Sequence, residues 1–182
     1  RRLALPPLTD FWEHLLGALP LLACDAALAP VPSDVDRPVV QTGYLHLGKS
    51  TAFPAGGQLL AESDLAPELR TWLAAGSRPL FAGFGSMPPG DARRWIPMVT
   101  AAVRALGRRL ILQTADGLGN TPPSRQDLYM GTSFPHPALF PRTRAVIHHG
   151  GAGTTATAAR SGVPQIIVPH ILDQYFWAKR IH

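Results

Sequence analysis

Residues 145–174 constrain the fold of this chain more than any other part of its sequence. They begin Ala-Val-Ile-His-His-Gly-Gly-Ala-Gly-Thr-Thr and later continue Ser-Gly-Val-Pro-Gln-Ile-Ile-Val-Pro. The apolar runs at 145–148 and 165–168 are typical of buried strands in a parallel sheet. The interval between the two runs has room for one helix, which Gly162 should end. The stretch therefore predicts a strand–helix–strand unit.

The turn between the first strand and the helix is rich in glycine. Gly150, Gly151 and Gly153 allow the backbone to approach a ligand without obstruction by Cβ atoms. Thr154 and Thr155 are N-cap candidates for the helix that follows. Because a helix N-terminus presents unpaired N–H groups and the positive end of its dipole, the turn is a candidate anion site. Glycine turns are also common packing devices in α/β domains, so both interpretations stay open at this point.

Polar side chains stand where both strands should end. His148 and His149 close the first strand, and Asp173 and Gln174 follow the second. Ligands of open α/β sheets bind at the carboxyl ends of the strands, so these residues should share one edge. We interpret that edge as a phosphate site with a hydroxyl-binding pair beside it, which suits a nucleotide-sugar. The alternative for Asp173 is a role as the N-cap of a helix that begins near Gln174.

The rest of the chain repeats the alternation of apolar runs and helical patterns. Asp10 is a plausible cap for a short helix, and strands are expected at 24–30 and 39–45. Further helices are expected at 67–75 and 91–106, and further strands at 80–84, 109–113 and 128–131. This order predicts an α/β domain with a doubly wound, mainly parallel sheet.

Composition and motif checks narrow the function classes. The chain has 182 residues, of which 46% are hydrophobic and 16% charged, so it can form a substantial core. The net charge is +5, but the basic residues are dispersed, and no nucleic-acid partner is expected. The single cysteine, Cys24, is interpreted as a small buried residue. With no apolar run long enough for a transmembrane segment, the sequence favours a cytoplasmic protein.

Three familiar nucleotide-binding or catalytic motifs do not fit. The glycine turn is neither the Gly-x-Gly-x-x-Gly of dinucleotide-binding dehydrogenases nor the Gly-Lys-Ser/Thr phosphate loop. The sequence Gly-Phe-Gly-Ser-Met at 83–87 is not the Gly-x-Ser-x-Gly nucleophile elbow of hydrolases. The anion site therefore calls for another class of enzyme or binding protein.

The stretch from His148 to Gln174 resembles the donor-binding motif of family-one glycosyltransferases. The likeness is greatest to sterol-type and antibiotic-tailoring enzymes of the GT-B fold. Val-Gln-Thr-Gly-Tyr at 40–44, Phe-Ala-Gly-Phe-Gly-Ser-Met at 81–87 and Pro-His-Pro-Ala-Leu-Phe-Pro-Arg at 135–142 match further motifs, in the family's order. The resemblance covers nearly the whole chain. It implies a Rossmann-like donor domain that is truncated at both ends.

The resemblance also implies a division of the chain. Residues 1–48 would be the remnant of an N-terminal acceptor domain, and 49–77 an interdomain linker with a short helix. Residues 78–182 would be the nucleotide-sugar donor-binding domain, incomplete at its C-terminus. We expect the fragment to associate with itself where the truncation exposes apolar surface.

The implied reaction is an inverting, metal-independent transfer of a sugar from a nucleotide diphosphate to a hydroxyl of a lipophilic acceptor. The donor would be UDP-glucose or a TDP-sugar, acting as substrate without a further cofactor, and the acceptor a sterol or a polyketide or peptide natural product. Relatives keep the catalytic base in the early N-terminal domain, so no catalytic residue is assigned here, and the fragment alone should be inactive. The alternatives are a non-catalytic nucleotide-sugar-binding module and a cell-wall-type GT-B glycosyltransferase.

The resemblance assigns roles to particular residues. The diphosphate would be bound by Ser86, His148, Gly150, Gly151, Ala152, Gly153 and Thr154. The sugar would be held by Asp173 and Gln174, and the nucleoside would lie near Phe134 and His136. For His136, contact with the ligand and fixation of its own loop are equally open. No metal ligand is expected.

Overall fold

The computed structural model describes residues 10–45, 64–85, 89–114 and 125–182. By its internal contacts the chain divides into one unit of residues 1–49 and a second of residues 50–182. The predicted Ser86 site lies outside the described residues. No helix in the described ranges is long and apolar enough to cross a membrane.

The first unit contains helix α1 (Phe11–Leu16) and two short parallel strands, β1 (Leu21–Leu22) and β2 (Val40–Gln41). The predicted cap is confirmed, since Asp10 Oδ1 accepts a hydrogen bond of 2.9 Å from the Glu13 amide. The strand predicted at 24–30 is wrong. Asp25 Oδ1 accepts from the Ala27 amide at 2.9 Å, which fixes a turn there, and the strand lies earlier, at β1.

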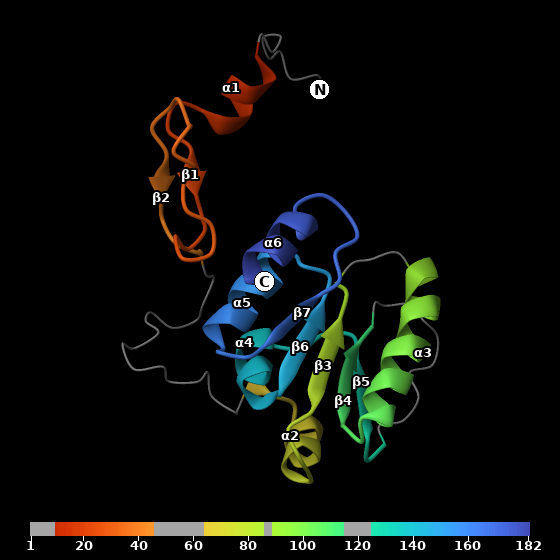
Figure 1. Cartoon of the computed structure of the whole chain (residues 1–182). Helices are drawn as coiled ribbons and strands as arrows, with labels where there is room; N and C mark the ends of the chain where they lie inside the picture. The colour runs from red at the N-terminus through yellow and green to blue at the C-terminus, as the bar shows by residue number, and fades with distance from the viewer. Residues whose placement is uncertain (1–9, 46–63, 86–88, 115–124) are drawn as a thin grey trace, which may run out of the picture. The chain divides into compact units, whose positions relative to one another are not determined.

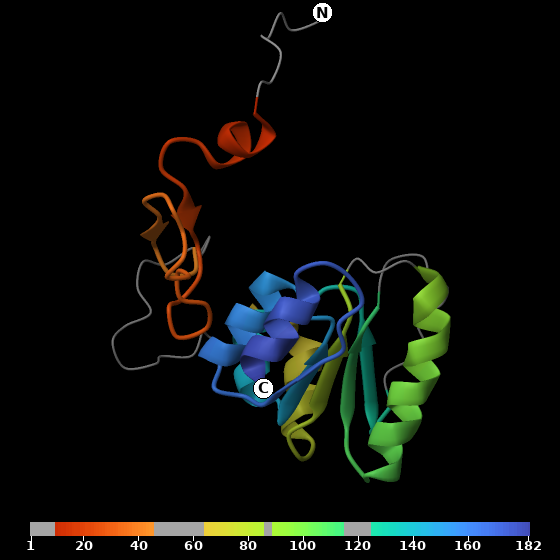
Figure 2. The same cartoon turned by 45° about the horizontal axis from the view of Figure 1, so that its top comes forward.

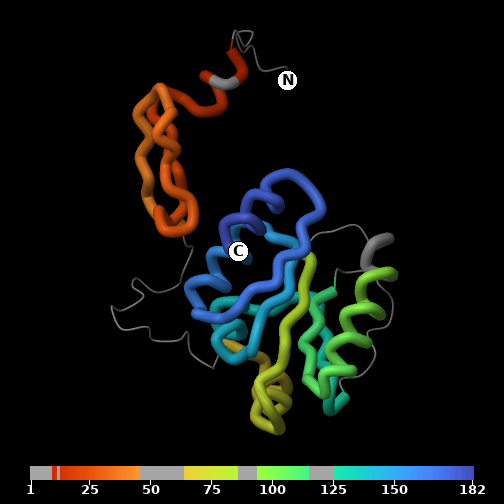
Figure 3. Tube along the Cα trace, viewed as in Figure 1, coloured from red at the N-terminus to blue at the C-terminus, as the bar shows by residue number. Residues whose placement is uncertain are grey.

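The second unit is built on a five-stranded sheet in the order β5-β4-β3-β6-β7, with every pair of neighbours parallel (Figure 1). The strands are β3 (Leu80–Gly83), β4 (Leu110–Gln113), β5 (Leu128–Gly131), β6 (Ala145–His148) and β7 (Gln165–Ile167). The predicted doubly wound parallel sheet is confirmed, because the predicted apolar runs form its strands and the pairs β3–β4, β5–β6 and β6–β7 are each connected through a described helix. The trace in Figure 3 follows β3 through the middle of the sheet.

Helices cover both faces of this sheet, as Figure 2 shows. Elements α2 (Pro67–Ala74), α4 (His136–Leu139), the 3-10 turn η2 (Phe140–Arg142) and α5 (Ala152–Arg160) lie on one face, and α3 (Pro89–Ala105) lies on the other. Helix α6 (Gln174–Ile181) packs beside α5 and β7. The two cores follow the alternation of the strands, since Phe81 faces one core and Ala82 the other, both fully buried.

The burial predicted for the strand at 165–168 is wrong. Strand β7 ends one residue early and lies at the edge of the sheet, and Ile166 is 52% exposed. Ile147, the register partner of Ile166 in β6, still packs against the core on the α3 side of the sheet. The described residues of that core come mainly from α3, β3, β4 and β5, and none of them lies in β7. An apolar run thus forms a strand without being covered on both faces.

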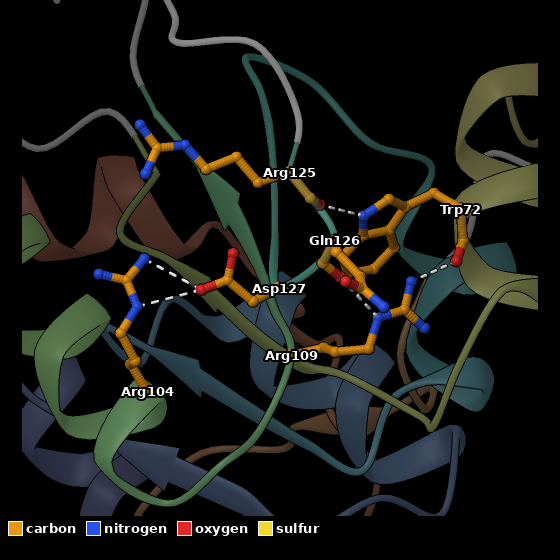
Figure 4. Close-up of polar contacts among 6 residues, drawn as sticks. All are labelled: Trp72, Arg104, Arg109, Arg125, Gln126 and Asp127. Atoms are coloured by element: carbon orange, nitrogen blue, oxygen red, sulfur yellow. Dashed lines mark hydrogen bonds and ion pairs between the residues drawn. The ribbon is translucent and has the colours of Figure 1, made fainter.

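A clamp around Arg109 ties α2 to the start of β4 (Figure 4). Its guanidinium lies 3.6 Å from the centroid of the Trp72 ring and donates to the Trp72 carbonyl, to the Ser77 carbonyl at 3.1 Å and to the Gln126 carbonyl at 3.2 Å. The Trp72 indole N–H in turn donates to the Arg125 carbonyl at 2.7 Å. The Trp72 carbonyl lies in the last turn of α2, so the Arg109 side chain links the end of this helix to the start of β4.

Candidate functional site

The candidate site lies at the carboxyl end of the sheet, where three neighbouring strands stop together. Gly83 of β3, His148 of β6 and Ile167 of β7 are register partners, so the turns that follow them meet at one edge. Helix α5 begins directly above this edge, in the turn after β6. The predicted convergence of these segments is confirmed by the register.

Helix α5 begins earlier than predicted, with its N-cap before Thr154. Gly151 is the N-cap, with φ −62° and ψ 138°, and Ala152 is the first helical residue, so the prediction of Thr154 or Thr155 as the cap is wrong. The Thr155 amide instead makes the first helical bond, to the Gly151 carbonyl at 2.9 Å. The amides of Ala152, Gly153 and Thr154 precede that bond, so they have no acceptor within the helix. These N–H groups and the dipole give the edge a positive side.

Gly150 is required by the packing of this turn. Its amide donates to His148 Nδ1 at 3.1 Å, and its contact with a diphosphate stays a prediction. Its φ is +93°, and a Cβ atom there would lie 2.7 Å from Ile167 Cγ2 and 3.1 Å from the Gln174 carbonyl oxygen. Only glycine allows β7 and α6 to approach this turn so closely.

His148 is fully buried, and both of its ring nitrogens are bonded within the chain. Nε2 lies 2.9 Å from Gln165 Oε1, and Nδ1 accepts from the Gly150 amide. Burial lowers the pKa of His148 to about 4, so the ring is neutral at pH 7 with its hydrogen on Nε2. Both ring nitrogens thus support the turn after β6, and the role of His148 as a diphosphate donor stays a prediction.

His149 is the histidine that faces the edge, and the sequence assignment missed it. A Cβ atom at Gly85 would lie 2.8 Å from His149 Cε1, and one at Gly151 would lie 2.7 Å from its Nε2. Its Nδ1 is buried, with no hydrogen-bond partner among the described residues. Burial and His170 lower the pKa of His149, while Asp173 and the Gly83 backbone oppose that shift. Alternation along β6 could have separated the two histidines, since neighbours in a strand point to opposite faces.

The predicted sugar-binding pair lies at the start of α6, after the segment that follows β7. Gln174 is buried, and its Oε1 accepts from the amides of His170 at 2.8 Å and Ile171 at 3.1 Å, so it fixes this segment. Asp173 is exposed and occupies the N-cap position of α6, where its Oδ2 accepts from the Trp177 indole at 3.0 Å. Leu172, just before this pair in the chain, is 85% exposed and has a left-handed φ of 49°.

The loop after β5 is fixed by the residues predicted to lie near a nucleoside. His136 Nε2 lies 2.8 Å from Gln113 Oε1, and its ring stacks on Phe140 with centroids 4.5 Å apart. Burial lowers the pKa of His136 to about 4. Phe134 packs edge-on against Phe81 at 6.2 Å. Of the two roles left open for His136, fixation of the loop is the one that these contacts show.

No group of three or more His, Cys, Asp or Glu side chains in the described part of the chain is arranged to hold a metal ion. The groups found at this edge are the N–H donors of α5, the partly buried imidazole of His149 and the exposed carboxylate of Asp173. Such a set can bind an anion and, beside it, hydroxyl groups.

Sequence comparison finds relatives over nearly the whole chain. The profile of the erythromycin biosynthesis protein CIII-like C-terminal domain matches residues 109–182. Glycosyltransferase GtfE and vancomycin aglycone glucosyltransferase, both of Amycolatopsis orientalis, are each 40% identical over 181 residues, or 98% of this chain. Sterol 3-beta-glucosyltransferase UGT80A2 of Arabidopsis thaliana is 35% identical over 156 residues, or 85% of this chain. The chain spans 40% of the length of the two bacterial relatives and 23% of the plant one.

Solved structures agree with this relationship. UDP-glucose: anthocyanidin 3-O-glucosyltransferase in complex with UDP matches 90% of this chain and 38% of its own, with a TM-score of 0.65 at 20% identity, which shows the fold alone. The glycosyltransferase SsfS6 of Streptomyces sp. SF2575, complexed with thymidine diphosphate, matches 62% of this chain and 30% of its own, with a TM-score of 0.50 at 28% identity. Residues 109–182 thus match the EryCIII-like C-terminal domain, and the chain is a homologue of antibiotic and sterol glycosyltransferases over part of their length.

Proposed function

We propose that this chain provides the donor site of an inverting glycosyltransferase that uses a UDP- or TDP-sugar and a lipophilic hydroxyl acceptor. In this proposal residues 1–48 belong to the acceptor-binding part, 49–77 connect the parts, and 78–182 bind the donor. The observation that carries it is the pairing of α5 N–H groups, which have no helical acceptor, with the unpartnered Nδ1 of His149 at one edge. Both groups suit an anion, and the relatives transfer sugars.

The diphosphate would be bound by the amides of Ala152, Gly153 and Thr154 together with His149, in place of His148 and Gly150. Negative charge grows on the leaving diphosphate as the bond between the anomeric carbon of the sugar and the diphosphate oxygen breaks. Hydrogen-bond donors that already point at this oxygen therefore lower the barrier. The helix N-terminus supplies this positive side, and the proposal therefore includes no metal. Ser86, which follows Gly85, is kept as a further phosphate contact on the strength of its position in the sequence.

The sugar would lie beside the exposed Asp173, whose carboxylate can accept hydrogen bonds from hydroxyl groups. Gln174 would act mainly by holding the segment that presents Asp173, since its Oε1 already accepts from two backbone amides. The acceptor hydroxyl must also lose a proton to a base, and we assign none among the described residues. The sterol and vancomycin-aglycone relatives support a lipophilic acceptor.

The test is calorimetric titration of the 182-residue chain with UDP and TDP. We expect binding of at least one of them, and His149→Ala should weaken it about ten- to a hundredfold, because a charge-assisted hydrogen bond contributes about 1.5–3 kcal/mol. The control is His14→Ala, an exposed histidine of α1, which should bind like the wild type. The absence of binding by the folded wild type to both nucleotides would contradict the proposal.

Catalysis is tested separately, because the alternative of a non-catalytic binding module predicts the same titrations. With UDP-glucose or a TDP-sugar and sterol or aglycone acceptors, we expect the 182-residue chain alone to form no glycoside. Joined to the rest of a longer protein, it should form one, and failure to do so across donors and acceptors would favour the binding module.

A further inference from the structure

Four buried side-chain nitrogens in the described part of the chain lack a hydrogen-bond partner, and two of them are ring nitrogens at the candidate site. They are His149 Nδ1, from the turn after β6, and His170 Nε2, from the segment between β7 and α6. A buried polar atom without a partner costs free energy that an apolar residue of the same shape would avoid. Two such atoms at one edge therefore call for an explanation other than packing.

The two imidazoles flank the same turn. The His170 ring meets the Phe84 ring edge-on, with centroids 5.7 Å apart and planes at 83°. The next residue, Gly85, lies beneath the His149 ring, where a Cβ atom would be 2.8 Å from His149 Cε1. Phe84 and Gly85 directly follow β3, so His170 reaches from β7 across to the turn that His149 covers.

The position of His170 is fixed by its own backbone. Its amide donates to Gln174 Oε1 at 2.8 Å, and its carbonyl accepts from the Tyr175 hydroxyl at 3.4 Å. Gln174 is itself buried, so the ring of His170 is held against Phe84 while its Nε2 is left unbonded. A ring nitrogen that is placed this firmly can meet a ligand with little loss of entropy.

The charges around the pair favour an anion. His170 is one of the groups that lower the pKa of His149, and Asp173 is the nearby group that raises it. His148 is neutral beneath the turn, and the N-terminus of α5 adds a positive field from the side of Gly151. Asp173 is thus the one acidic group among the described residues that acts on His149.

We propose that His170 is a second imidazole ligand of the donor diphosphate, which it contacts through Nε2 opposite His149. The inference rests on the proposed function and adds to it a residue from a different strand. In this arrangement the anion is bound between the turn after β6 and the segment after β7, so β3, β6 and β7 all contribute to one phosphate site.

The experiment compares two replacements of His170 in the 182-residue chain. His170→Phe keeps the aromatic contact with Phe84 but has no ring nitrogen, and His170→Gln places an amide N–H near the position of Nε2. Binding of UDP, TDP, inorganic pyrophosphate and uridine is measured by calorimetry, and thermal unfolding is followed in parallel. His14→Phe is the matched control, since that histidine is exposed on α1.

We expect His170→Phe to weaken the nucleoside diphosphate that the wild type binds, and pyrophosphate, by about tenfold, the loss of one hydrogen bond to a charged group. His170→Gln should remain within about threefold of the wild type, and uridine should bind all variants equally. The unfolding midpoint of His170→Phe should not fall, which separates a lost ligand contact from a damaged fold.

Three results would overturn the inference. Equal binding of the nucleoside diphosphate by His170→Phe and the wild type, with His149→Ala still weakened, would remove His170 from the site and leave the proposed function intact. An equal loss for uridine would assign His170 to the nucleoside rather than to the diphosphate. A folded wild type that binds neither UDP nor TDP would contradict both the inference and the proposed function.

Discussion

The two ends of the sheet in the second unit are built in opposite ways. At the amino end the Arg109 guanidinium bonds several carbonyls and covers the Trp72 ring, and Arg104 pairs with Asp127 at 3.0 Å. At the carboxyl end buried ring nitrogens lack partners, and Leu172 adopts a left-handed conformation. The contacts at the amino end thus stabilise the fold, whereas the carboxyl end keeps polar atoms that lower the stability of the free protein and that we propose a ligand satisfies.

The largest expected effect comes from closing the space around Gly150. Gly150→Ala places a Cβ atom 2.7 Å from Ile167 Cγ2 at a φ of +93°. We expect the free energy of unfolding of the second unit to fall by about 4 kcal/mol, from left-handed strain and overpacking together. Chemical denaturation followed by tryptophan fluorescence measures it.

The matched control for that change is Gly162→Ala. Gly162 also has a positive φ, +65°, but a Cβ atom added there would meet nothing within 4 Å. The substitution should therefore lower the free energy of unfolding by about 1 kcal/mol, because it adds backbone strain but no overpacking. If both variants lost the same free energy of unfolding, the close approach of β7 and α6 to Gly150 would not contribute to stability.

Acid should weaken the carboxyl end selectively. The pKa of buried His148 is lowered from 6.5 to about 4, so between these values the unfolded chain binds a proton that the folded chain does not. Stability is then fully present above pH 6.5 and is lost as the pH falls towards 4, by on the order of 3 kcal/mol for this residue. Denaturation curves at half-unit pH intervals measure the loss.

The comparison for this pH dependence is His148→Asn, whose Oδ1 can still accept from the Gly150 amide. Subtracting the two stability curves cancels the carboxylates and His136, whose pKa is also lowered to about 4. The wild type should lose stability more steeply than His148→Asn over this interval. Parallel curves would contradict the assignment of a buried neutral imidazole.

The smallest effect concerns the amino end. Arg109→Met removes the guanidinium from the Trp72 ring and from its carbonyl partners, and we expect a loss of about 2 kcal/mol in stability. UDP and TDP affinity should stay within twofold, because the clamp lies at the other end of the sheet. Arg104→Met, which breaks only the exposed pair with Asp127, should cost less than about 1 kcal/mol. A loss of nucleotide affinity in Arg109→Met would break the contrast between the two ends.

Much of this fold could be predicted from local sequence. The apolar runs indicated the strands of the sheet because parallel strands buried on both faces need continuous apolar residues. The edge position of β7 could not be found in this way, since Ile166 is exposed only because of the strand order. The turn at Asp25, where a strand was predicted, likewise depends on a single hydrogen bond from the Ala27 amide to the Asp25 side chain.

The site was predicted in place but not in detail. The order of strand, glycine-rich turn and helix was enough to predict that the site lies at the carboxyl edge of the sheet. The internal hydrogen bond of His148 could not be foreseen, because its partner Gln165 lies 17 residues further along the chain, beyond what a local pattern reveals. The start of α5 was misplaced because a glycine in extended conformation caps it, while the Thr155 hydroxyl bonds back to the Gly151 carbonyl.

The central position of β3 has a consequence for where this protein can be divided. The family profile begins at residue 109, after β3, yet β3 is the strand that joins β4 to β6. Removed from its upstream sequence, the segment 109–182 would keep the pairs β4–β5 and β6–β7 as separate ribbons. The segment matched by the family profile is therefore smaller than the five-stranded sheet, and a recombination boundary between relatives belongs upstream of α2.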